Sequence, residues 1–364
     1  MTNNIIIIGS FKIPIGGNFG GVYQVSTTLR DKLISLGFKI IEIDTTLKNI
    51  NVTKLSKRFF SVFFRQFYFI YSIFTSFKAK YIFIFLSGGN SYVDKLLVLL
   101  FSKLFNINIV IFPRSGYLVS DFKNKIYSFL ILLYFSTSDK IICQSLFWKN
   151  FFISKGVDKS KLLVIENWVS NYVIEKSEIL NFKTDFIEKI VFKMVFLSRI
   201  EEDKGIKDVL DLALQLKESN TFEFEIDVYG SGSYEDQFII DINDLALKDC
   251  VKYKGWLSKD VMLSTLNKYN LGLFFSKTEG YPNALLDFIF AKIPILASKI
   301  PMVEAVGKDN MVYWDKNANE SLIDKVLFCH NNYSILIKNS KKLYLEKYEA
   351  NNIDFVVSKL LNNI

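Results

Sequence analysis

The sequence predicts an α/β protein with two domains, each a doubly wound parallel sheet covered by helices. Short apolar runs alternate with longer helical segments, and this alternation occurs once in the first half of the chain and again in the second. Strands that alternate with helices favour parallel sheets with helices on both faces. At 364 residues the chain also exceeds the usual size of a single hydrophobic core, which suits two domains.

The strands of the first half begin with the apolar run NIIII. They are predicted at Asn4–Ile8, Lys39–Ile43, Tyr81–Phe85, Ile107–Phe112 and Lys140–Cys143. A helix is expected over Gly21–Leu36, and a long helical region begins at Thr53. These elements build the first sheet.

The second half repeats the pattern. Its strands are predicted at Phe192–Leu197, Phe222–Tyr229, Val251–Tyr253, Leu271–Phe275, Ile295–Ala297 and Met311–Tyr313. Helices are expected at Lys207–Lys217, Lys259–Tyr269, Asn283–Lys292 and, as a closing amphipathic helix, about Asn332–Asn363.

The domain boundary is predicted in the polar stretch 167–189, which has neither the helix nor the strand period. We expect an N-terminal domain at 1–170, a linker at 171–189 and a C-terminal domain at 190–345. The last residues, 346–364, are expected to form a helix that crosses back to the N-terminal domain.

Composition excludes several classes of protein. Three widely spaced cysteines fit free thiols in a reducing compartment, so we expect a cytoplasmic protein without disulfides. The first residues lack the basic region of a signal peptide, and Arg65 and Gln66 interrupt the longest apolar stretch, so no membrane span is expected. With one histidine, a zinc site is not expected.

The stretch SKTEGYPNALLDFIFAKIP contains two acids whose placement suggests a ligand site. Glu279 follows an apolar strand, and a helix begins beside Pro282, a residue suited to a helix start. Such a helix start binds anions, and ligands of open α/β sheets bind outside the carboxyl ends of strands. Asp287 lies roughly one and a half turns inside the helix. The alternative is that Glu279 is a solvated acid in a loop and that Asp287 is a charge favoured by the helix dipole.

A second candidate is the stretch VFLSRIEEDKG, in which Arg199 and Lys204 follow a buried strand and precede a helix. A guanidinium fork and an ammonium group can bind an anionic ligand. The alternative is that Arg199 and Lys204 lie in a solvated loop and form salt bridges with the three acids between them.

Four glycines between the first strand and the first helix form a third candidate, which includes Gly16 and Gly17. Glycine lets a backbone approach a ligand closely, but the spacing is not that of a dinucleotide-binding loop.

The segment Glu279-Gly-Tyr-Pro-Asn-Ala-Leu-Leu-Asp287, followed by Pro294-Ile-Leu-Ala-Ser298, resembles the signature of the family four retaining glycosyltransferases. The resemblance implies a GT-B fold and a nucleotide-sugar donor. By it Glu279 contacts the transferred sugar, Asp287 binds the ribose, and Arg199 and Lys204 clamp the diphosphate. The remaining donor-binding residues that it implies are Gly16, Gly17, Gly280, Tyr281, Pro282, Asn283 and Ala284. Two positions depart from the pattern: Asp287 replaces a glutamate and Lys292 a glycine.

On the acceptor side, FPRSGYL, residues 112–118, resembles the family's acceptor loop. Many family members carry a histidine in this half, and this chain has none there, so Arg114 and Ser115 are the candidates for that region.

The segment Lys54–Lys80 mixes lysine and arginine with many aromatic residues, and the chain has a formal net charge of +8. A basic aromatic helix can lie on an anionic membrane surface. The alternative is that the aromatic residues pack in the core and the basic residues form the solvent-exposed face of the same helix. No nucleic-acid recognition motif is present, so nucleic acid is not an expected partner.

Together these observations predict a retaining glycosyltransferase of bacterial surface polysaccharide synthesis, such as O-antigen or capsule. It would move a sugar from a nucleotide-diphosphate donor, UDP favoured over GDP, to a glycan or polyprenyl-linked glycan. No cofactor or metal is expected. The alternatives are a nucleotide-sugar epimerase of the same fold and a noncatalytic membrane-binding or glycan-binding subunit.

Overall fold

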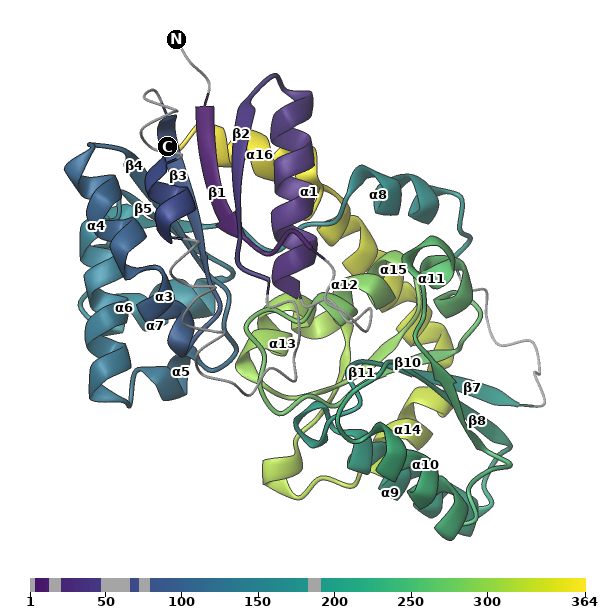
Figure 1. The fold of residues 1–364 in the computed structure, drawn as a ribbon. Helices are drawn as coiled ribbons and strands as arrows, with labels where there is room; N and C mark the ends of the chain where they lie inside the picture. The colour runs from purple at the N-terminus through teal and green to yellow at the C-terminus, as the bar shows by residue number, and fades with distance from the viewer. Residues whose placement is uncertain (1–3, 13–20, 47–65, 72–78, 183–190) are drawn as a thin grey trace. The chain divides into compact units, whose positions relative to one another are not determined.

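The computed structural model describes residues 4–12, 21–46, 66–71, 79–182 and 191–364. The chain divides into two compact units (Figure 1). The first comprises Met1–Val169 and Ile353–Ile364, and the second comprises Ser170–Asn352.

The first unit is built on a six-stranded sheet in the order β2-β1-β3-β4-β5-β6, and all neighbouring strands are parallel. The strands are β1 (Asn4–Gly9), β2 (Lys39–Asp44), β3 (Ala79–Leu86), β4 (Asn108–Pro113), β5 (Lys140–Cys143) and β6 (Leu162–Val164). The four isoleucines of β1 are fully buried because helices cover both faces of the sheet.

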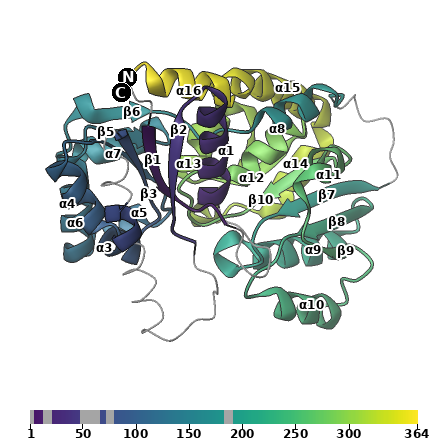
Figure 2. The ribbon, with the colours of Figure 1, turned by 45° about the horizontal axis from the view of Figure 1, so that its top comes forward.

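Helices α1 (Gly21–Ser35) and α16 (Ile353–Leu361) pack on one face of this sheet and against each other (Figure 2). The chain then runs in the opposite direction along the sheet, from β3 to β6. Because parallel crossovers are right-handed, the helices of these later connections lie on the other face. They are α3 (Asn90–Asp94), α4 (Leu96–Leu104), α5 (Leu118–Asp121), α6 (Lys125–Thr137) and α7 (Leu146–Ser154).

The second unit has a six-stranded parallel sheet in the order β12-β11-β10-β7-β8-β9. Its strands are β7 (Phe192–Leu197), β8 (Phe224–Tyr229), β9 (Val251–Gly255), β10 (Leu271–Phe274), β11 (Ile295–Ser298) and β12 (Val312–Trp314). The helices are α8 (Asn171–Glu178), α9 (Ile206–Ser219), α10 (Glu235–Asp244), α11 (Lys259–Leu266), α12 (Asn283–Phe290), α13 (Pro301–Gly307), α14 (Leu322–Asn331) and α15 (Tyr333–Ala350). In this order β10 lies beside β7, so the loops that follow these two strands are neighbours.

Every strand predicted from the sequence is present within two residues of its predicted ends. Strand β6 was missed because it has only three residues, at the edge of its sheet. Residues 171–178, predicted as linker, form α8 of the second unit. The predicted closing helix is two helices, α15 and α16, and they belong to different units. The break lies at Asn351, which is buried and whose Nδ2 donates to the hydroxyl of Tyr281 at 3.3 Å.

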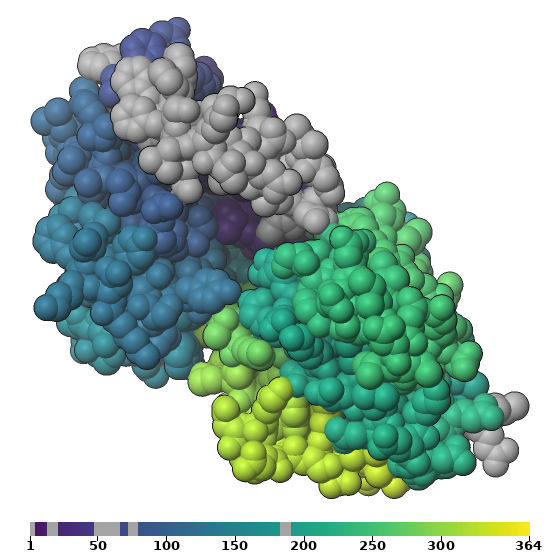
Figure 3. All heavy atoms as spheres, turned by 60° about the horizontal axis from the view of Figure 1, so that its bottom comes forward, coloured from purple at the N-terminus to yellow at the C-terminus, as the bar shows by residue number. Residues whose placement is uncertain are grey.

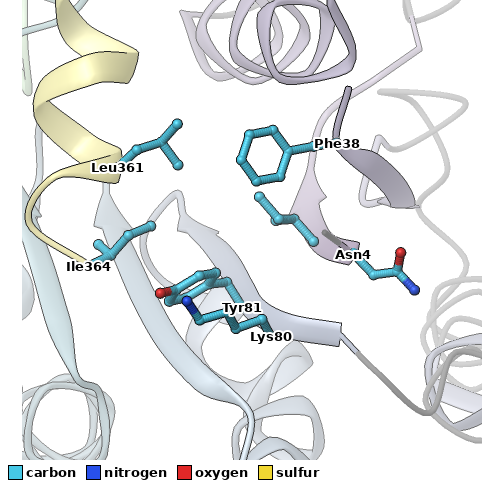
Figure 4. Close-up of a pocket in the computed structure, with 7 residues that line it drawn as sticks. Asn4, Phe38, Lys80, Tyr81, Leu361 and Ile364 are labelled. Atoms are coloured by element: carbon cyan, nitrogen blue, oxygen red, sulfur yellow. The ribbon is translucent and has the colours of Figure 1, made fainter. Parts of the chain in front are cut away.

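A pocket of about 210 Å³ opens at the amino ends of β1 and β3, against the last residues of the chain (Figure 4). It is lined by Asn4, Ile5, Phe38, Lys80, Tyr81, Leu361 and Ile364. Since ligands of such sheets bind at the carboxyl ends of the strands, this pocket is at the wrong edge for the predicted site.

Candidate active site

The loops that follow β7 and β10 meet at the carboxyl edge of the second unit's sheet. The amide of Lys277 donates to the carbonyl of Asp203 at 2.9 Å, which ties the two loops together. This contact brings the two predicted clusters, one around Lys204 and one around Glu279, to the same place. Their juxtaposition follows from the strand order, because β7 and β10 are hydrogen-bonded neighbours.

Lys204 and Glu279 form a direct ion pair. The Lys204 Nζ lies 2.9 Å from Glu279 Oε1, and it also donates to the carbonyl of Thr278 at 3.4 Å. Only 12% of the lysine side chain and 16% of the glutamate side chain are exposed. The pair is therefore shielded from most of the solvent, which strengthens its electrostatic interaction relative to a surface pair.

Ser276 also binds the carboxylate of Glu279. Its side chain is 1% exposed, and its hydroxyl donates to Glu279 Oε1 at 2.7 Å. Both hydrogen bonds that Glu279 accepts from described residues thus end on one oxygen, Oε1. These bonds hold Oε1 in place, and no described residue donates a hydrogen bond to Oε2.

Gly205 allows the Lys204 loop to reach this position. Its backbone is left-handed, with φ of +83°, and a Cβ placed on it would lie 2.4 Å from the backbone oxygen of Phe275. Any other residue would therefore push the loop away from β10. Gly205 ends the short 3₁₀ turn that contains Lys204 and precedes α9.

Arg199 lies in the first part of the same loop, directly after β7. Its guanidinium is 54% exposed and pairs with Glu201 at 2.6 Å. The loop after β8 packs closely here, because a Cβ on Gly230 would lie 1.7 Å from the carbonyl oxygen of Ser198. The structure therefore places Arg199 at the same sheet edge as Lys204, in an accessible position.

Asp287 lies on α12, the helix that begins after the Glu279 loop. Burial raises the pKa of Asp287 to about 6, and the charge of Lys259 partly opposes this shift. Lys259 is the first residue of α11, which packs against α12, and burial lowers the pKa of its ammonium group. Asp287 is thus a partly buried acid on an apolar helix that faces a cation.

The segment between the two acids is well packed. Gly280, Tyr281 and Pro282 are buried, and Asn283 and Ala284 are partly buried at the start of α12. The hydrogen bond from Asn351 holds the hydroxyl of Tyr281. The amides of this helix start supply the positive end of the helix dipole at the sheet edge.

Lys292, at a position where the resembled family has glycine, has a left-handed backbone with φ of +60°. Its Nζ donates to the carbonyl of Leu180 at 2.8 Å and lies over the rings of Phe182 and Tyr344, 4.5 and 4.6 Å from their centroids. These contacts offset the backbone strain that a non-glycine residue has at this angle.

In the first unit, Arg114 and Ser115 follow β4 at the carboxyl edge of its sheet, and both are buried. The Arg114 guanidinium donates to Asn167 and lies 5.1 to 5.9 Å from the ring centroids of Trp168, Phe112 and Phe85. It is therefore held within an aromatic cluster. Gly16 and Gly17 lie outside the described residues.

Three residues of this site were missed by the sequence analysis: Ser276, Lys259 and Asn351. Ser276 gave a weak signal, because it is a polar residue at the end of an apolar strand, three positions before Glu279. In the part of the chain that the structure describes, no group of three or more His, Cys, Asp and Glu side chains is arranged to hold a metal ion. No described helix is long and apolar enough to cross a membrane.

Two curated proteins are similar to this chain. The chain is 20% identical over 230 residues to an uncharacterized 41.2 kDa protein in the cps region of Klebsiella pneumoniae, covering 63% of this chain and 61% of that protein. It is 23% identical over 186 residues to the amylovoran biosynthesis glycosyltransferase AmsK of Erwinia amylovora, covering 50% of this chain and 44% of AmsK. The chain thus spans less than two thirds of the length of either relative.

Solved structures share the fold. Anabaena HepE, crystallised in complex with UDP and glucose, superposes with a TM-score of 0.71 at 13% identity over 100% of both chains. A glycosyltransferase from Rickettsia africae gives a TM-score of 0.70 at 17% identity, over 99% of this chain and 97% of that one. The two parallel six-stranded sheets are those of a GT-B fold.

The sequence profile of the glycosyl transferases group 1 family matches residues 180–343, which include Arg199, Lys204, Glu279 and Asp287. This match covers most of the second unit, and the fold comparison extends over both units. Residues 180–343 are thus similar to the glycosyl transferases group 1 family, and the two sheets have a GT-B fold.

Proposed function

We propose that this protein is a retaining glycosyltransferase that moves a sugar from a UDP-sugar to a glycan or polyprenyl-linked glycan in bacterial surface polysaccharide synthesis. The observation that carries the proposal is the shielded Lys204–Glu279 pair at the carboxyl edge of a group 1 domain, with Arg199 in the same loop. The names of the relatives from the cps region and from amylovoran biosynthesis support the class of product. The UDP and glucose bound by HepE support the class of donor.

In the proposed mechanism, Arg199 and Lys204 stabilise the negative charge that grows on the leaving diphosphate. A guanidinium fork and an ammonium group suit this task. Arg199 is accessible and would exchange its pairing with Glu201 for the diphosphate. The amides at the start of α12 add positive potential at the same edge. The protein thus supplies the positive charge itself, and no step of this mechanism calls for a metal.

Glu279 would orient the transferred sugar. Because Lys204 and Ser276 both bind Oε1, Oε2 can accept a hydrogen bond from a sugar hydroxyl. Asp287 would bind the ribose hydroxyls from α12, and for this it must be ionised. Catalysis is then a matter of orientation and charge, and in a front-face reaction the leaving diphosphate takes the proton of the acceptor.

We further propose that the protein acts in the cytoplasm, at the inner face of the cell membrane. Cys143, Cys250 and Cys329 are all buried free thiols, which supports a reducing compartment. Arg114 and Ser115, at the carboxyl edge of the first sheet, remain our candidates for the acceptor side.

The proposal is tested by incubating the full chain with UDP-glucose, UDP-galactose and UDP-N-acetylglucosamine, with and without a polyprenyl-linked acceptor fraction. We expect release of UDP and a glycosylated lipid from one donor, and little release when Glu279→Gln replaces the wild type. Conversion of a donor to its epimer without acceptor would instead assign an epimerase. Failure of all three UDP-sugars to bind or turn over would contradict the proposed UDP-sugar donor, and the same result with GDP-sugars would favour a noncatalytic binding subunit.

A further inference from the structure

The helical layer on one face of the first unit's sheet has an apolar outer surface. Helices α4 and α6 belong to consecutive crossovers, β3 to β4 and β4 to β5, so they lie on the same face of the sheet. They contact each other, and both contact β4 (Figure 1). The sides of α4 and α6 that point away from the sheet therefore form one surface.

Helix α4 is apolar on both sides. Its sheet side buries Val98, Leu99 and Ser102. On the opposite side Leu97, Leu100 and Leu104 are exposed, and the last of these by 72%. Their spacing of three and four residues places them on one stripe, where a helix between core and water normally carries polar side chains.

Helix α6 repeats this pattern. It buries Leu130, Ile131, Tyr134 and Phe135. Ile126 and Phe129 are exposed on its outer side, by 68% and 66%. We call the exposed apolar side chains of this layer the α4–α6 face; its members are Val93, Leu97, Leu100, Leu104, Ile126 and Phe129. Residues of this layer contribute to the blue surface in Figure 3.

Exposed aromatic residues also lie on a short segment that contacts α3. Within residues 66–71, Phe69 is buried, while Phe67, Tyr68 and Tyr71 are exposed. The side chain of Gln66 donates to the carbonyl of Asp94, the last residue of α3. This short segment is the described central part of the basic aromatic stretch 54–80; the rest of that stretch, apart from residues 79 and 80 in β3, lies outside the described residues.

The charge around the face is positive. Between residues 90 and 155 the sequence has eight lysines and arginines, of which Lys95 and Arg114 are buried, and three aspartates. Lys103, Lys123 and Lys125 are exposed on or next to α4 and α6. One of the aspartates, Asp121, accepts a hydrogen bond from Tyr92 within the unit. Large exposed apolar patches mark interaction sites, and a basic rim selects a partner with negative charge.

We propose that the α4–α6 face docks on an anionic lipid membrane, with its apolar side chains among the acyl chains and its lysines at the headgroups. Lipid suits this face better than a second copy of the chain, because an isologous contact would bring the same lysines together. An interfacial surface that is apolar with a basic rim is the pattern that anionic bilayers bind. The proposal rests on the proposed function for its purpose, since a polyprenyl-linked acceptor is presented at such a surface.

The test is flotation of the full chain with vesicles of phosphatidylglycerol and phosphatidylethanolamine, and with vesicles of phosphatidylcholine alone. We compare the wild type with the double variant Leu104→Glu/Phe129→Glu. The matched control is Leu345→Glu/Phe328→Glu, which changes a leucine and a phenylalanine exposed on α15 and α14 of the second unit. All four side chains are exposed, so neither double variant removes core packing.

We expect the wild type and the control to float with the anionic vesicles, less with phosphatidylcholine, and less as salt rises. The Leu104→Glu/Phe129→Glu variant is expected to lose binding by roughly tenfold or more. Equal flotation of this variant and the wild type, or a wild type that does not float with anionic vesicles, overturns the proposal. A wild-type dimer that only this variant dissociates, without vesicle binding, assigns the face to a second copy and also overturns it.

Turnover separates this proposal from the proposed function. Donor consumption by the Leu104→Glu/Phe129→Glu variant with a soluble acceptor is expected to equal that of the wild type, because the face is not part of the donor site. If the wild type turns over no donor but floats as predicted, the proposed function fails and the docking surface stands. If the wild type turns over a donor but does not float, the docking surface fails and the proposed function stands.

Discussion

The ammonium of Lys204 lies 2.9 Å from Glu279 Oε1, although 75 positions separate the two residues in the chain. The contact exists because β7 and β10 are neighbours in the sheet and because Gly205 lets the lysine loop lie against Phe275. It joins the residue proposed to neutralise the diphosphate to the residue proposed to orient the sugar.

Replacement of Lys204 by methionine keeps the length of the side chain and removes its charge. We expect kcat to fall by roughly 10²- to 10³-fold, the usual effect of losing one preorganised group that stabilises transition-state charge. Lys207→Met is the control, because Lys207 lies one turn away and pairs with Glu202 at the surface. Steady-state kinetics with the identified donor measures both. Equal kcat values for Lys204→Met and Lys207→Met would remove Lys204 from the mechanism.

Ser276 is a positioning residue for Glu279, because its buried hydroxyl binds the carboxylate oxygen that Lys204 also binds. A hydrogen bond to a charged group contributes about 1.5 to 3 kcal/mol, so Ser276→Ala is expected to lower kcat by roughly 10- to 100-fold. Ser276→Thr keeps the hydroxyl and is expected to recover most of the rate. If alanine and threonine reduce kcat alike, the hydroxyl does not position Glu279 and only the volume of the side chain matters.

Gly205 and Gly37 form a matched pair for testing the geometry of the lysine loop. Both have left-handed backbones, with φ of +83° and +84°, but a Cβ on Gly37 meets nothing within 4 Å. Gly37→Ala is expected to cost about 1 to 2 kcal/mol of stability from backbone strain alone. Gly205→Ala adds the clash with Phe275, so its melting temperature is expected to fall further and donor turnover to be lost. Equal melting temperatures and full turnover would contradict the close packing of this loop.

Asp287 gives donor binding a pH dependence. Its pKa is raised to about 6 by burial, so the carboxylate is ionised above pH 6 and protonated below it. We expect UDP affinity, measured by calorimetry, to fall as pH drops through about 6. Because Lys259 opposes the shift, Lys259→Met is expected to move this midpoint to higher pH, and Lys259→Arg to leave it near the wild-type value.

Asp287→Asn provides the control for this dependence. The pKa of Asp287 in the folded chain lies above its value in the unfolded chain, so ionisation of Asp287 disfavours the folded state. The stability that the protonated carboxyl provides at low pH is therefore lost as pH rises from about 4 to about 6. The asparagine variant is therefore expected to be at least as stable as the wild type at pH 7, with weak UDP binding that no longer varies around pH 6. If Asp287→Asn still shows a midpoint of UDP binding near pH 6, the pH dependence originates in another group.

The fold was predictable from the sequence because the apolar strands and the helices between them have clear periods, as in NIIII of β1 and in α9. Glu279, Asp287, Arg199 and Lys204 were identified because each lies at a fixed distance from a strand end or a helix start. Ser276, Lys259 and Asn351 were not, because their roles depend on partners brought close by the fold. Tyr281, for example, lies 70 positions from Asn351.

The break between α15 and α16 was missed for a similar reason. The helical period continues through Asn351, whereas in the structure this asparagine is buried at the helix end and its side chain donates to Tyr281. Lys292 illustrates the opposite case. The sequence revealed the departure from glycine, whereas the carbonyl and aromatic rings that accommodate the lysine are visible only in the structure.

The most direct test of the central claim is a crystal structure of the chain with UDP bound. We predict that the diphosphate lies within hydrogen-bond distance of both Arg199 and Lys204, with the ribose hydroxyls at Asp287. UDP bound away from the carboxyl edge of the second unit's sheet, with Arg199 still on Glu201 and Lys204 out of reach of the phosphates, would contradict the account.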